Sequence, residues 1–285
     1  MPFIKKMISF QAAIFFSCFI YARNYFVFQD TLHAVDSVIN QEDCYDKFFQ
    51  QSEKISSPDK TMLVKKNGKT VSLTAFLKTN PPDILIANQS QFGLADLDND
   101  GKKELVIYNY TGGAHCCDEF YIFKNIALNK YQYAAKTFAG DVCIMDKNEF
   151  TYNFYQQFGY FFTCFACEYQ DTSDVAPGPL RNIVLKYSKG RLMVIPGDKE
   201  LRSMINDNLG KLKEQPYEKL SQDYDQDNGL RKEFAFNLAV YYYSFGKNLI
   251  ETKKLFDKYY KFPDAKKVWS EFVLILAQIK KDNDF

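Results

Sequence analysis

The pattern of apolar and polar positions divides the chain into a β-rich part and a helical part. From residue 61 to residue 195, short apolar runs typical of strands alternate with turn residues. Asn67-Gly68 separates two such runs and predicts a tight hairpin, and Ser188-Lys189-Gly190 predicts a second one. The other predicted strands cover residues 84–87, 105–110, 120–123, 131–138 and 150–155.

After Pro196-Gly197, apolar residues recur at three- and four-residue spacings, which is typical of amphipathic helices. Pro263 separates the last two of these helices, and Asp264 is placed to cap the final one. A similar helical pattern covers residues 30–55. The chain is therefore predicted to have an α+β fold, in which a mainly antiparallel β-sheet domain precedes an all-α domain of helical hairpins. The C-terminal helices are expected at residues 198–213, 230–245, 249–261 and 264–280.

The first residues have the pattern of a secretory signal peptide. Lys5 and Lys6 precede a mostly apolar run, and Ala22 supplies a small residue at the expected cleavage point. The run is shorter than the ~20 residues that a membrane-spanning helix needs. We therefore expect export to the periplasm, the cell surface or the medium, and no integral membrane anchor after cleavage. The predicted parts are a signal peptide (1–22), an N-terminal helical segment (23–59), the β domain (60–196) and the helical domain (197–285).

Charge and composition narrow the possible functions. Hydrophobic residues make up 46% of the chain and charged residues 25%, as in an ordinary folded protein. Cleavage would remove Lys5 and Lys6 and no acid, which takes the net charge from +1 to −1. Such a charge gives no electrostatic basis for nucleic-acid binding. Residues 150–169 contain ten aromatic side chains, which we interpret as a sheet core rather than a carbohydrate platform.

Six cysteines remain after cleavage, and an even number in an exported chain favours disulfides. In a structural interpretation, the adjacent cysteines 116 and 117 form disulfides with two of the cysteines at 143, 164 and 167. The cysteine at 44 then pairs with the one of these three that remains. Zinc ligation with His115 and a redox-active Cys-x-x-Cys are the alternatives, and both are disfavoured. Adjacent cysteines on a strand point apart, and redox motifs normally open a helix. The cysteines concerned are Cys44, Cys116, Cys117, Cys143, Cys164 and Cys167.

One acidic loop carries the clearest chemistry. Asp96, Asp98, Asp100 and Glu104 occupy positions 1, 3, 5 and 9 of this loop. Calcium takes six to eight oxygen ligands, which closely spaced carboxylates and a backbone carbonyl supply. Two carboxylates ~5 Å apart repel each other by roughly 3 kcal/mol at an effective dielectric constant near 20. Four such groups at one point therefore indicate a bound cation.

The loop differs from an EF-hand, because Ile107 stands where position 12 requires Glu and a strand pattern follows. With Phe92-Gly93 before it, the loop instead resembles the calcium loop of FG-GAP and VCBS-type repeats, which occur in integrin-like propellers. The resemblance covers a single copy, about residues 91–110, and Glu104 stands where such repeats more often have Asp. It implies calcium held by Asp96, Asp98, Asp100 and Glu104 and by the carbonyl of Lys102.

A second acidic run, residues 223–229, shows a similar alternation of acids. It directly precedes a predicted helix, so Asp227 or Asn228 is expected to cap that helix. Phe234 stands where Glu would close an EF-hand. We therefore interpret this run as a cap or a solvated linker rather than an ion site.

The common nucleophile, zinc-protease and phosphate-binding motifs are absent from the sequence. The sequence therefore favours a protein that is not an enzyme: an exported, calcium-binding, disulfide-stabilised binding module whose partner is a protein or glycan of the cell envelope. Calcium would be structural, with a dissociation constant of ~0.1–1 mM by analogy with extracellular modules. The alternative is an exported hydrolase with a site near His115 and Asp118 or in the aromatic-rich sheet. A thiol oxidoreductase that uses Cys164 and Cys167 is a third possibility.

Overall fold

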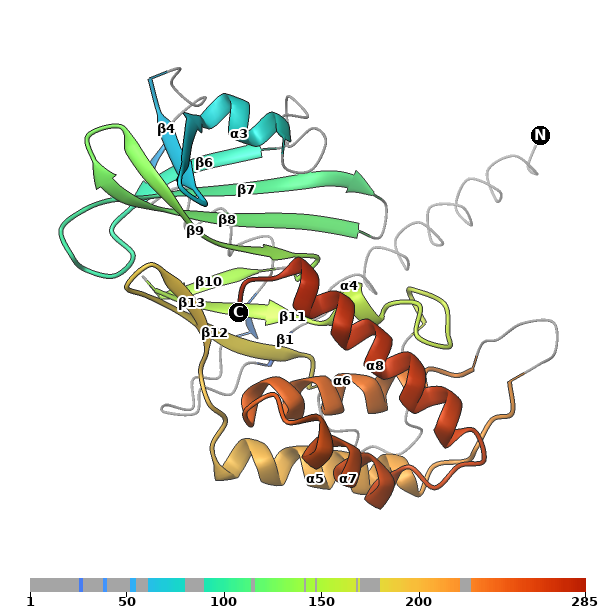
Figure 1. Cartoon of the computed structure of the whole chain (residues 1–285). Coiled ribbons are helices and arrows are strands. Elements are labelled where there is room, and N and C mark those ends of the chain that lie inside the picture. The colour runs from blue at the N-terminus through green and yellow to red at the C-terminus, as the bar shows by residue number, and fades with distance from the viewer. Residues whose placement is uncertain are drawn as a thin grey trace, which may run out of the picture.

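The described part of the structure, a computed structural model, contains a seven-stranded sheet, a four-stranded sheet, a two-stranded sheet and a group of C-terminal helices (Figure 1). This arrangement confirms the predicted α+β class. Within the part of the chain that the structure describes, no helix combines the length and the apolar character needed to cross a membrane. The described residues are 26–27, 38–39, 52–54, 61–79, 90–113, 116–140, 142–146, 148–167, 169, 180–220 and 227–285.

The larger sheet has seven strands in the order β3-β6-β7-β8-β9-β4-β5. Its centre is an antiparallel meander, and the β4–β5 hairpin joins it through a parallel pairing of β4 with β9. The sheet is therefore mixed, although antiparallel pairs predominate. Its strands are β3 (Glu53–Lys54), β4 (Leu63–Lys66), β5 (Lys69–Ser72), β6 (Ser90–Ala95), β7 (Glu104–Gly113), β8 (Cys116–Ala127) and β9 (Lys130–Phe138).

Both predicted hairpins are confirmed. Asn67 and Gly68 have φ angles of 50° and 78° between β4 and β5, and Lys189 and Gly190 have 52° and 77° between β12 and β13. Two consecutive left-handed residues match the right-handed twist of the flanking strands, and Asn and Gly adopt this conformation at low cost.

The smaller sheet packs against one face of the larger one. Phe120 of β8 and Phe150 of β11 have ring centroids 5.4 Å apart. The opposite face of the larger sheet is covered by α3 (Leu73–Thr79), whose Phe76 lies 5.4 Å from the ring of Phe123. The four strands of the smaller sheet are β10 (Cys143–Asp146), β11 (Glu149–Asn153), β12 (Asn182–Ser188) and β13 (Arg191–Val194).

The helices share one apolar core with the sheets. The cluster that contains Phe120 and Phe150 also contains Leu209, Phe236 and Phe272, which come from three different helices. The central helix, α6, is buried on nearly all sides. The helices are α4 (Tyr155–Phe158), α5 (Lys199–Lys213), α6 (Leu230–Ser244), α7 (Leu249–Tyr259) and α8 (Ala265–Asp282).

The residues after α8 connect the helical part to the larger sheet. The backbone N–H of Asp284 donates to the carbonyl of Lys136 at 3.0 Å, and the side chain of Asn283 accepts from the N–H of Phe138 at 2.8 Å. The ring of Phe285 packs on Tyr152 of β11, with centroids 4.9 Å apart. The predicted β and helical parts are thus joined by polar and apolar contacts.

Two parts of the N-terminal prediction can be compared with the structure. Within residues 30–55, β2 (Val38–Ile39) and β3 are strands, so the predicted helix is wrong at these positions. Val38–Ile39 pairs with β1 (Phe26–Val27), and Glu53–Lys54 adds an edge to the larger sheet. The predicted signal peptide and the predicted strand 84–87 lie outside the described residues.

Candidate metal site

The acidic loop connects β6 to β7, and its ends are held by the pairing of Ala95 with Glu104. Leu97 is fully buried, which anchors the middle of the loop to the core. The carboxylate of Asp96 accepts the N–H groups of Asp100 at 3.1 Å and Gly101 at 3.0 Å. These contacts fold the loop back on itself. Gly101, with a φ of 83°, provides the left-handed residue that this reversal needs.

Three of the five predicted ligands converge. Asp96, Asp98 and Glu104 each contribute a carboxylate oxygen to a group in which all three atoms lie within 4.8 Å of one another. Asp100 is exposed and is not part of this group, and its Oδ1 accepts the N–H of Lys102 at 2.9 Å. Ligation by Asp100 and by the carbonyl of Lys102 therefore stays a prediction.

Two oxygens of this group are buried and have no hydrogen-bond partner in the described structure, Oδ1 of Asp98 and Oε1 of Glu104. The second oxygen of Glu104, Oε2, accepts the N–H of Leu97 at 2.9 Å. Burial, together with the charges of Asp98 and Asp100, raises the pKa of Glu104 to about 7, against the effect of the Leu97 N–H. Buried carboxylate oxygens without partners are costly, and a cation would satisfy both of them.

Lys124 supplies a positive charge from the neighbouring strand. Its Nζ lies 3.4 Å from Oδ2 of Asp98 and 3.4 Å from Oδ2 of Asp100. Burial lowers the pKa of Lys124, but the charges of the two aspartates raise it by more, so the net shift is upward. Sequence reasoning missed Lys124, because only the pairing of β7 with β8 brings it to the loop.

Tyr187 of β12 brings the smaller sheet to the same site. Its hydroxyl is buried and makes no hydrogen bond with the described residues. Burial raises the pKa of Tyr187, and the negative charges of Glu104, Asp98 and Asp100 add to the increase. A buried polar oxygen therefore lies in the electrostatic field of the loop. No feature of the sequence around Tyr187 indicated that its hydroxyl would lie near the acidic loop.

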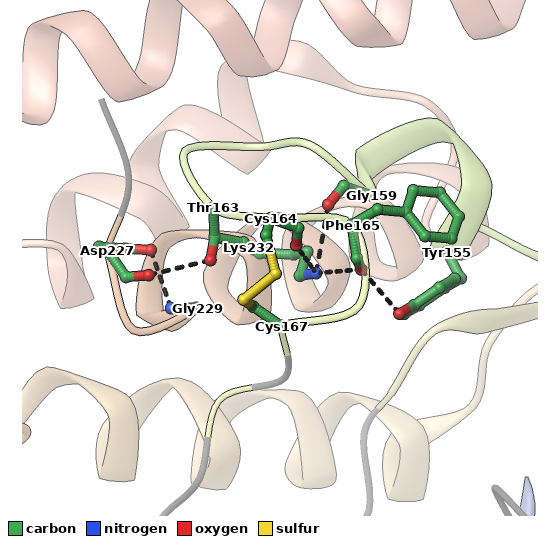
Figure 2. The surroundings of a disulfide bond; sticks show 9 residues. All are labelled: Tyr155, Gly159, Thr163, Cys164, Phe165, Cys167, Asp227, Gly229 and Lys232. Carbon is green, nitrogen blue, oxygen red and sulfur yellow. Dashed lines mark hydrogen bonds between the residues drawn. A yellow bond between two sulfur atoms is a disulfide. The ribbon is translucent and has the colours of Figure 1, made fainter. Parts of the chain in front are cut away.

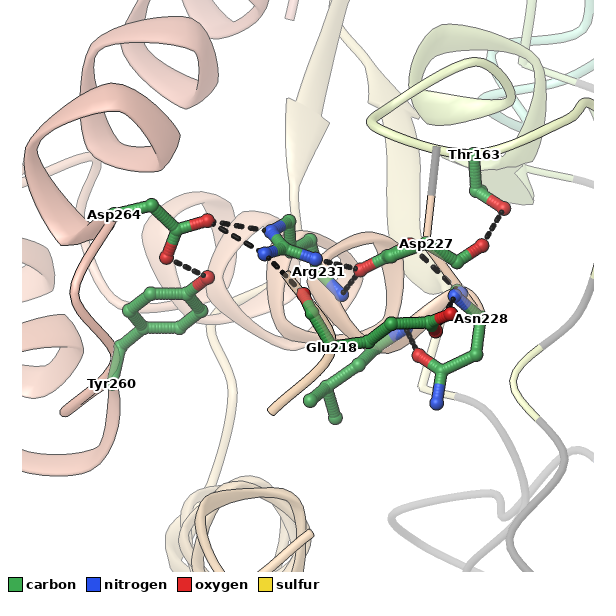
Figure 3. Close-up of polar contacts among 9 residues, drawn as sticks. Thr163, Glu218, Asp227, Asn228, Arg231, Tyr260 and Asp264 are labelled. Carbon is green, nitrogen blue, oxygen red and sulfur yellow. Dashed lines mark hydrogen bonds and ion pairs between the residues drawn. The ribbon is translucent and has the colours of Figure 1, made fainter. Parts of the chain in front are cut away.

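The second acidic run has a different environment (Figure 3). Asp227 forms an ion pair with Arg231, with Oδ2 and Nη1 2.6 Å apart, and both side chains are almost completely buried. The carboxylate of Asp227 also accepts the N–H of Arg231 at 3.2 Å, and Asn228 accepts the N–H of Leu230 at 3.2 Å. The predicted N-cap position is wrong, because Gly229 occupies it, but both side chains do accept N–H groups of the first turn of α6.

Asp264 occupies the predicted N-cap position of α8, but the expected side-chain cap is not formed. Instead, Oδ2 lies 2.7 Å from Nη2 of Arg231, and Oδ1 accepts the hydroxyl of Tyr260 at 2.9 Å. The buried guanidinium of Arg231 attracts the carboxylate more strongly than the exposed helix end does, because charge interactions strengthen as water is removed.

The Cys-x-x-Cys segment is closed by a disulfide between Cys164 and Cys167, whose Cα atoms are 5.0 Å apart (Figure 2). The expectation that the adjacent cysteines 116 and 117 both pair within the set 143, 164 and 167 is therefore wrong, because this bridge leaves only Cys143 of that set. The bridge leaves no thiolate at either position, so the zinc interpretation that used them is also wrong. Cys143 is disulfide-bonded as well, while the side chains of cysteines 44, 116 and 117 lie outside the described residues.

A buried lysine, which sequence reasoning missed, holds the disulfide loop in place. Lys232 is 2% exposed, and its Nζ donates to the carbonyls of Gly159, Cys164 and Phe165 at 3.2, 3.2 and 3.0 Å (Figure 2). The small loop is thereby fixed against α6. These contacts hold the Cys164–Cys167 bridge against α6.

The hydrolase alternative depended on His115, Asp118 and the aromatic-rich sheet. His115 lies outside the described residues. The carboxylate of Asp118 is buried and accepts the N–H groups of Gly140 at 3.1 Å and Val142 at 3.4 Å, so it holds the backbone of that segment. Phe150 and Tyr152 of the aromatic-rich stretch are fully buried, which confirms the interpretation as sheet core.

An open groove of about 510 Å³ lies between β13 and the end of α6. Its lining includes Arg202, Phe245, Lys247 and Phe285, and contains no carboxylate side chain, histidine or cysteine. Arg202 stacks on Phe245, with Cζ 4.0 Å from the ring centroid. The groove can therefore contact anionic or aromatic groups.

Comparison with known proteins gives no match to a family model, to a curated protein or to a solved structure. The resemblance of the acidic loop to FG-GAP and VCBS-type repeats therefore stays a prediction based on residues 91–110.

Proposed function

We propose that this protein is an exported, calcium-binding and disulfide-stabilised binding module of the cell envelope, in which calcium is structural. The observation that supports the proposal is the group formed by Asp96, Asp98 and Glu104. One carboxylate oxygen of each residue lies within 4.8 Å of the others, and Asp98 and Glu104 each also have a buried oxygen without a partner in the described structure. Burying carboxylate oxygens without partners is costly, and a cation bound here would remove that cost.

The donor set fits calcium better than a transition metal. All candidate ligands are carboxylate oxygens, and hard cations prefer oxygen. The loop is short and bends at a glycine, and the flexible coordination of calcium tolerates such a loop more readily than the strict octahedron of magnesium does. Asp96, Asp98 and Glu104 would hold the ion, and water molecules would complete its coordination.

The position of the loop favours a structural role for the cation. Leu97 fixes the loop to the core, and Glu104 is the first residue of β7. An ion held by these residues would stabilise the connection between β6 and β7. The Cys164–Cys167 bridge supports an oxidising compartment, because disulfides persist mainly outside the cytosol. The groove beside Phe245 is the candidate surface for a partner.

The direct test is a calorimetric titration of the purified protein with calcium chloride. We expect one site with a dissociation constant of ~0.1–1 mM. Asp98→Asn should weaken binding at least tenfold, because it removes one ligand charge while it keeps the shape of the side chain. Asp207→Asn, at an exposed position of α5, is the matched control and should bind like the wild type. Absence of binding at 10 mM calcium, or equal binding by the Asp98 variant, would overturn the proposal.

A further inference from the structure

We infer that Lys124 is an internal counter-cation that occupies part of the acidic loop and competes electrostatically with calcium. This inference depends on the proposed function for the identity of the site. Its basis is geometric, because Nζ of Lys124 lies 3.4 Å from a carboxylate oxygen of both Asp98 and Asp100. The side chains of Lys124 and Asp98 are 28% and 8% exposed, so solvent screens this pair only in part.

The fold restricts where the ammonium group of Lys124 can go. The side chain lies under the β12–β13 hairpin, so that a Cβ atom added at Gly190 would be 3.3 Å from Cδ of Lys124. The same hairpin carries Tyr187, whose buried hydroxyl lies in the field of the acids. Lys124 is thus held between the acidic loop and the second sheet.

One ammonium group compensates the loop incompletely. Lys124 contacts Oδ2 of Asp98 and Oδ2 of Asp100, whereas Oδ1 of Asp98 and Oε1 of Glu104 remain buried and without partners in the described structure. The loop therefore keeps a place for a divalent ion. That ion must bind close to an existing positive charge, and the repulsion between them lowers its affinity.

Two consequences follow for the protein. Without calcium, Lys124 partly neutralises the loop and supports its folded form. With calcium, the repulsion from Lys124 keeps the dissociation constant high, in the range where a site responds to extracellular calcium concentrations. Lys124 thereby lowers the affinity of the loop for calcium and stabilises the loop when no metal is bound.

The test uses the full chain with Lys124→Met, which keeps much of the aliphatic side chain and removes the charge. Calorimetric titration with calcium chloride at low ionic strength should give a dissociation constant at least tenfold lower than that of the wild type. In chelator, the same variant should melt a few degrees below the wild type, because Asp98 and Asp100 lose their counter-ion. Lys124→Arg keeps the charge and should bind calcium within about threefold of the wild type.

Lys266→Met, at an exposed position of α8, is the charge-matched control and should leave both measurements unchanged. Unchanged or weaker calcium binding by Lys124→Met, with normal binding by the wild type, would overturn the inference and leave the proposed function intact. Absence of binding in both the wild type and Lys124→Met would overturn the proposed function and the inference with it. Binding by Lys124→Met alone would overturn calcium binding as a function of the wild-type protein and would support the competition by Lys124.

Discussion

Two acidic runs of this chain have similar sequences and different environments. Residues 96–101 and residues 223–229 both alternate aspartates with other residues and end at a glycine. In the second run, Asp227 is neutralised by a guanidinium group one helical turn away, in Arg231. In the first run, the contacts of Asp98 with Lys124 leave its Oδ1 buried and without a partner in the described structure.

The difference shows that the spacing of acids does not by itself decide whether a metal is needed. An internal cation can satisfy a buried carboxylate completely when its donors are numerous and well placed, as those of arginine are. Lys124 reaches one oxygen of each of its two partners. The loop between β6 and β7 therefore retains unsatisfied charge, whereas Asp227 before α6 is compensated by Arg231. The following predictions test this comparison.

The largest effect is expected for Asp227→Ala. The substitution leaves the buried Arg231 with Asp264 as its remaining ion-pair partner among the described residues, and removes an acceptor for two N–H groups. Breaking a buried pair typically costs about 3–5 kcal/mol. Urea unfolding should show this loss equally in calcium and in chelator, because the pair needs no metal. A loss that appears in only one of the two conditions would contradict the comparison, and Asp207→Ala is the exposed control.

Asp98→Ala should have a smaller effect that depends on calcium. If the dissociation constant is ~0.1–1 mM, 10 mM calcium stabilises the wild type by about 1.4–2.7 kcal/mol. The variant should lose this increment and unfold in calcium as it does in chelator. The measurement is the difference in the free energy of unfolding between the two conditions. If the variant kept the full stabilisation by calcium, the ion would bind elsewhere in the protein.

Glu104→Gln should change the pH dependence of stability. The pKa of Glu104 is raised to about 7 in the folded protein, above its ordinary value of 4.5, because the carboxyl is buried. The folded state therefore holds this proton more tightly than the unfolded state does. In chelator, the contribution of Glu104 to wild-type stability should be highest below pH 4.5, should fall as the pH rises from 4.5 to about 7, and should then level off.

Glutamine keeps the acceptor for the N–H of Leu97 and carries no charge. In chelator at pH 8, Glu104→Gln should therefore exceed the wild type in stability by about 1–2 kcal/mol, and the two should converge toward pH 5. In calcium the wild type should be more stable than Glu104→Gln, because the variant lacks the charge of one ligand. Unfolding curves at several pH values test both statements, and parallel pH profiles in chelator would contradict the first.

The smallest effect is expected for Asn228→Ala in the second run. Its side chain accepts one N–H at the start of α6, and the loss of such a contact typically costs about 0.5–1 kcal/mol. Calcium should not alter this value. A calcium-dependent loss, measured by the same unfolding experiment, would mean that both acidic runs bind the ion.

The elements that were predicted correctly depend on residues close together in the sequence. Asn67-Gly68 specifies its hairpin through backbone conformations available to those two residues. The predicted helix from residue 198 begins as expected, since Asp198 accepts the N–H of Leu201 at 2.8 Å. The predictions failed where a distant charge changed the partner, as it does for Asp264, or where a segment pairs with a sheet, as Glu53–Lys54 does.

The sequence by itself determined the α+β class, the hairpin turns, the four C-terminal helices and the acidic loop as the candidate site, because each depends on local conformation or local spacing. Only the tertiary structure decided which charges meet. Lys124 reaches the loop through the pairing of β7 with β8, and Tyr187 reaches it through the packing of two sheets. Such contacts join residues far apart in the chain, and burial sets their strength, so no local pattern records them.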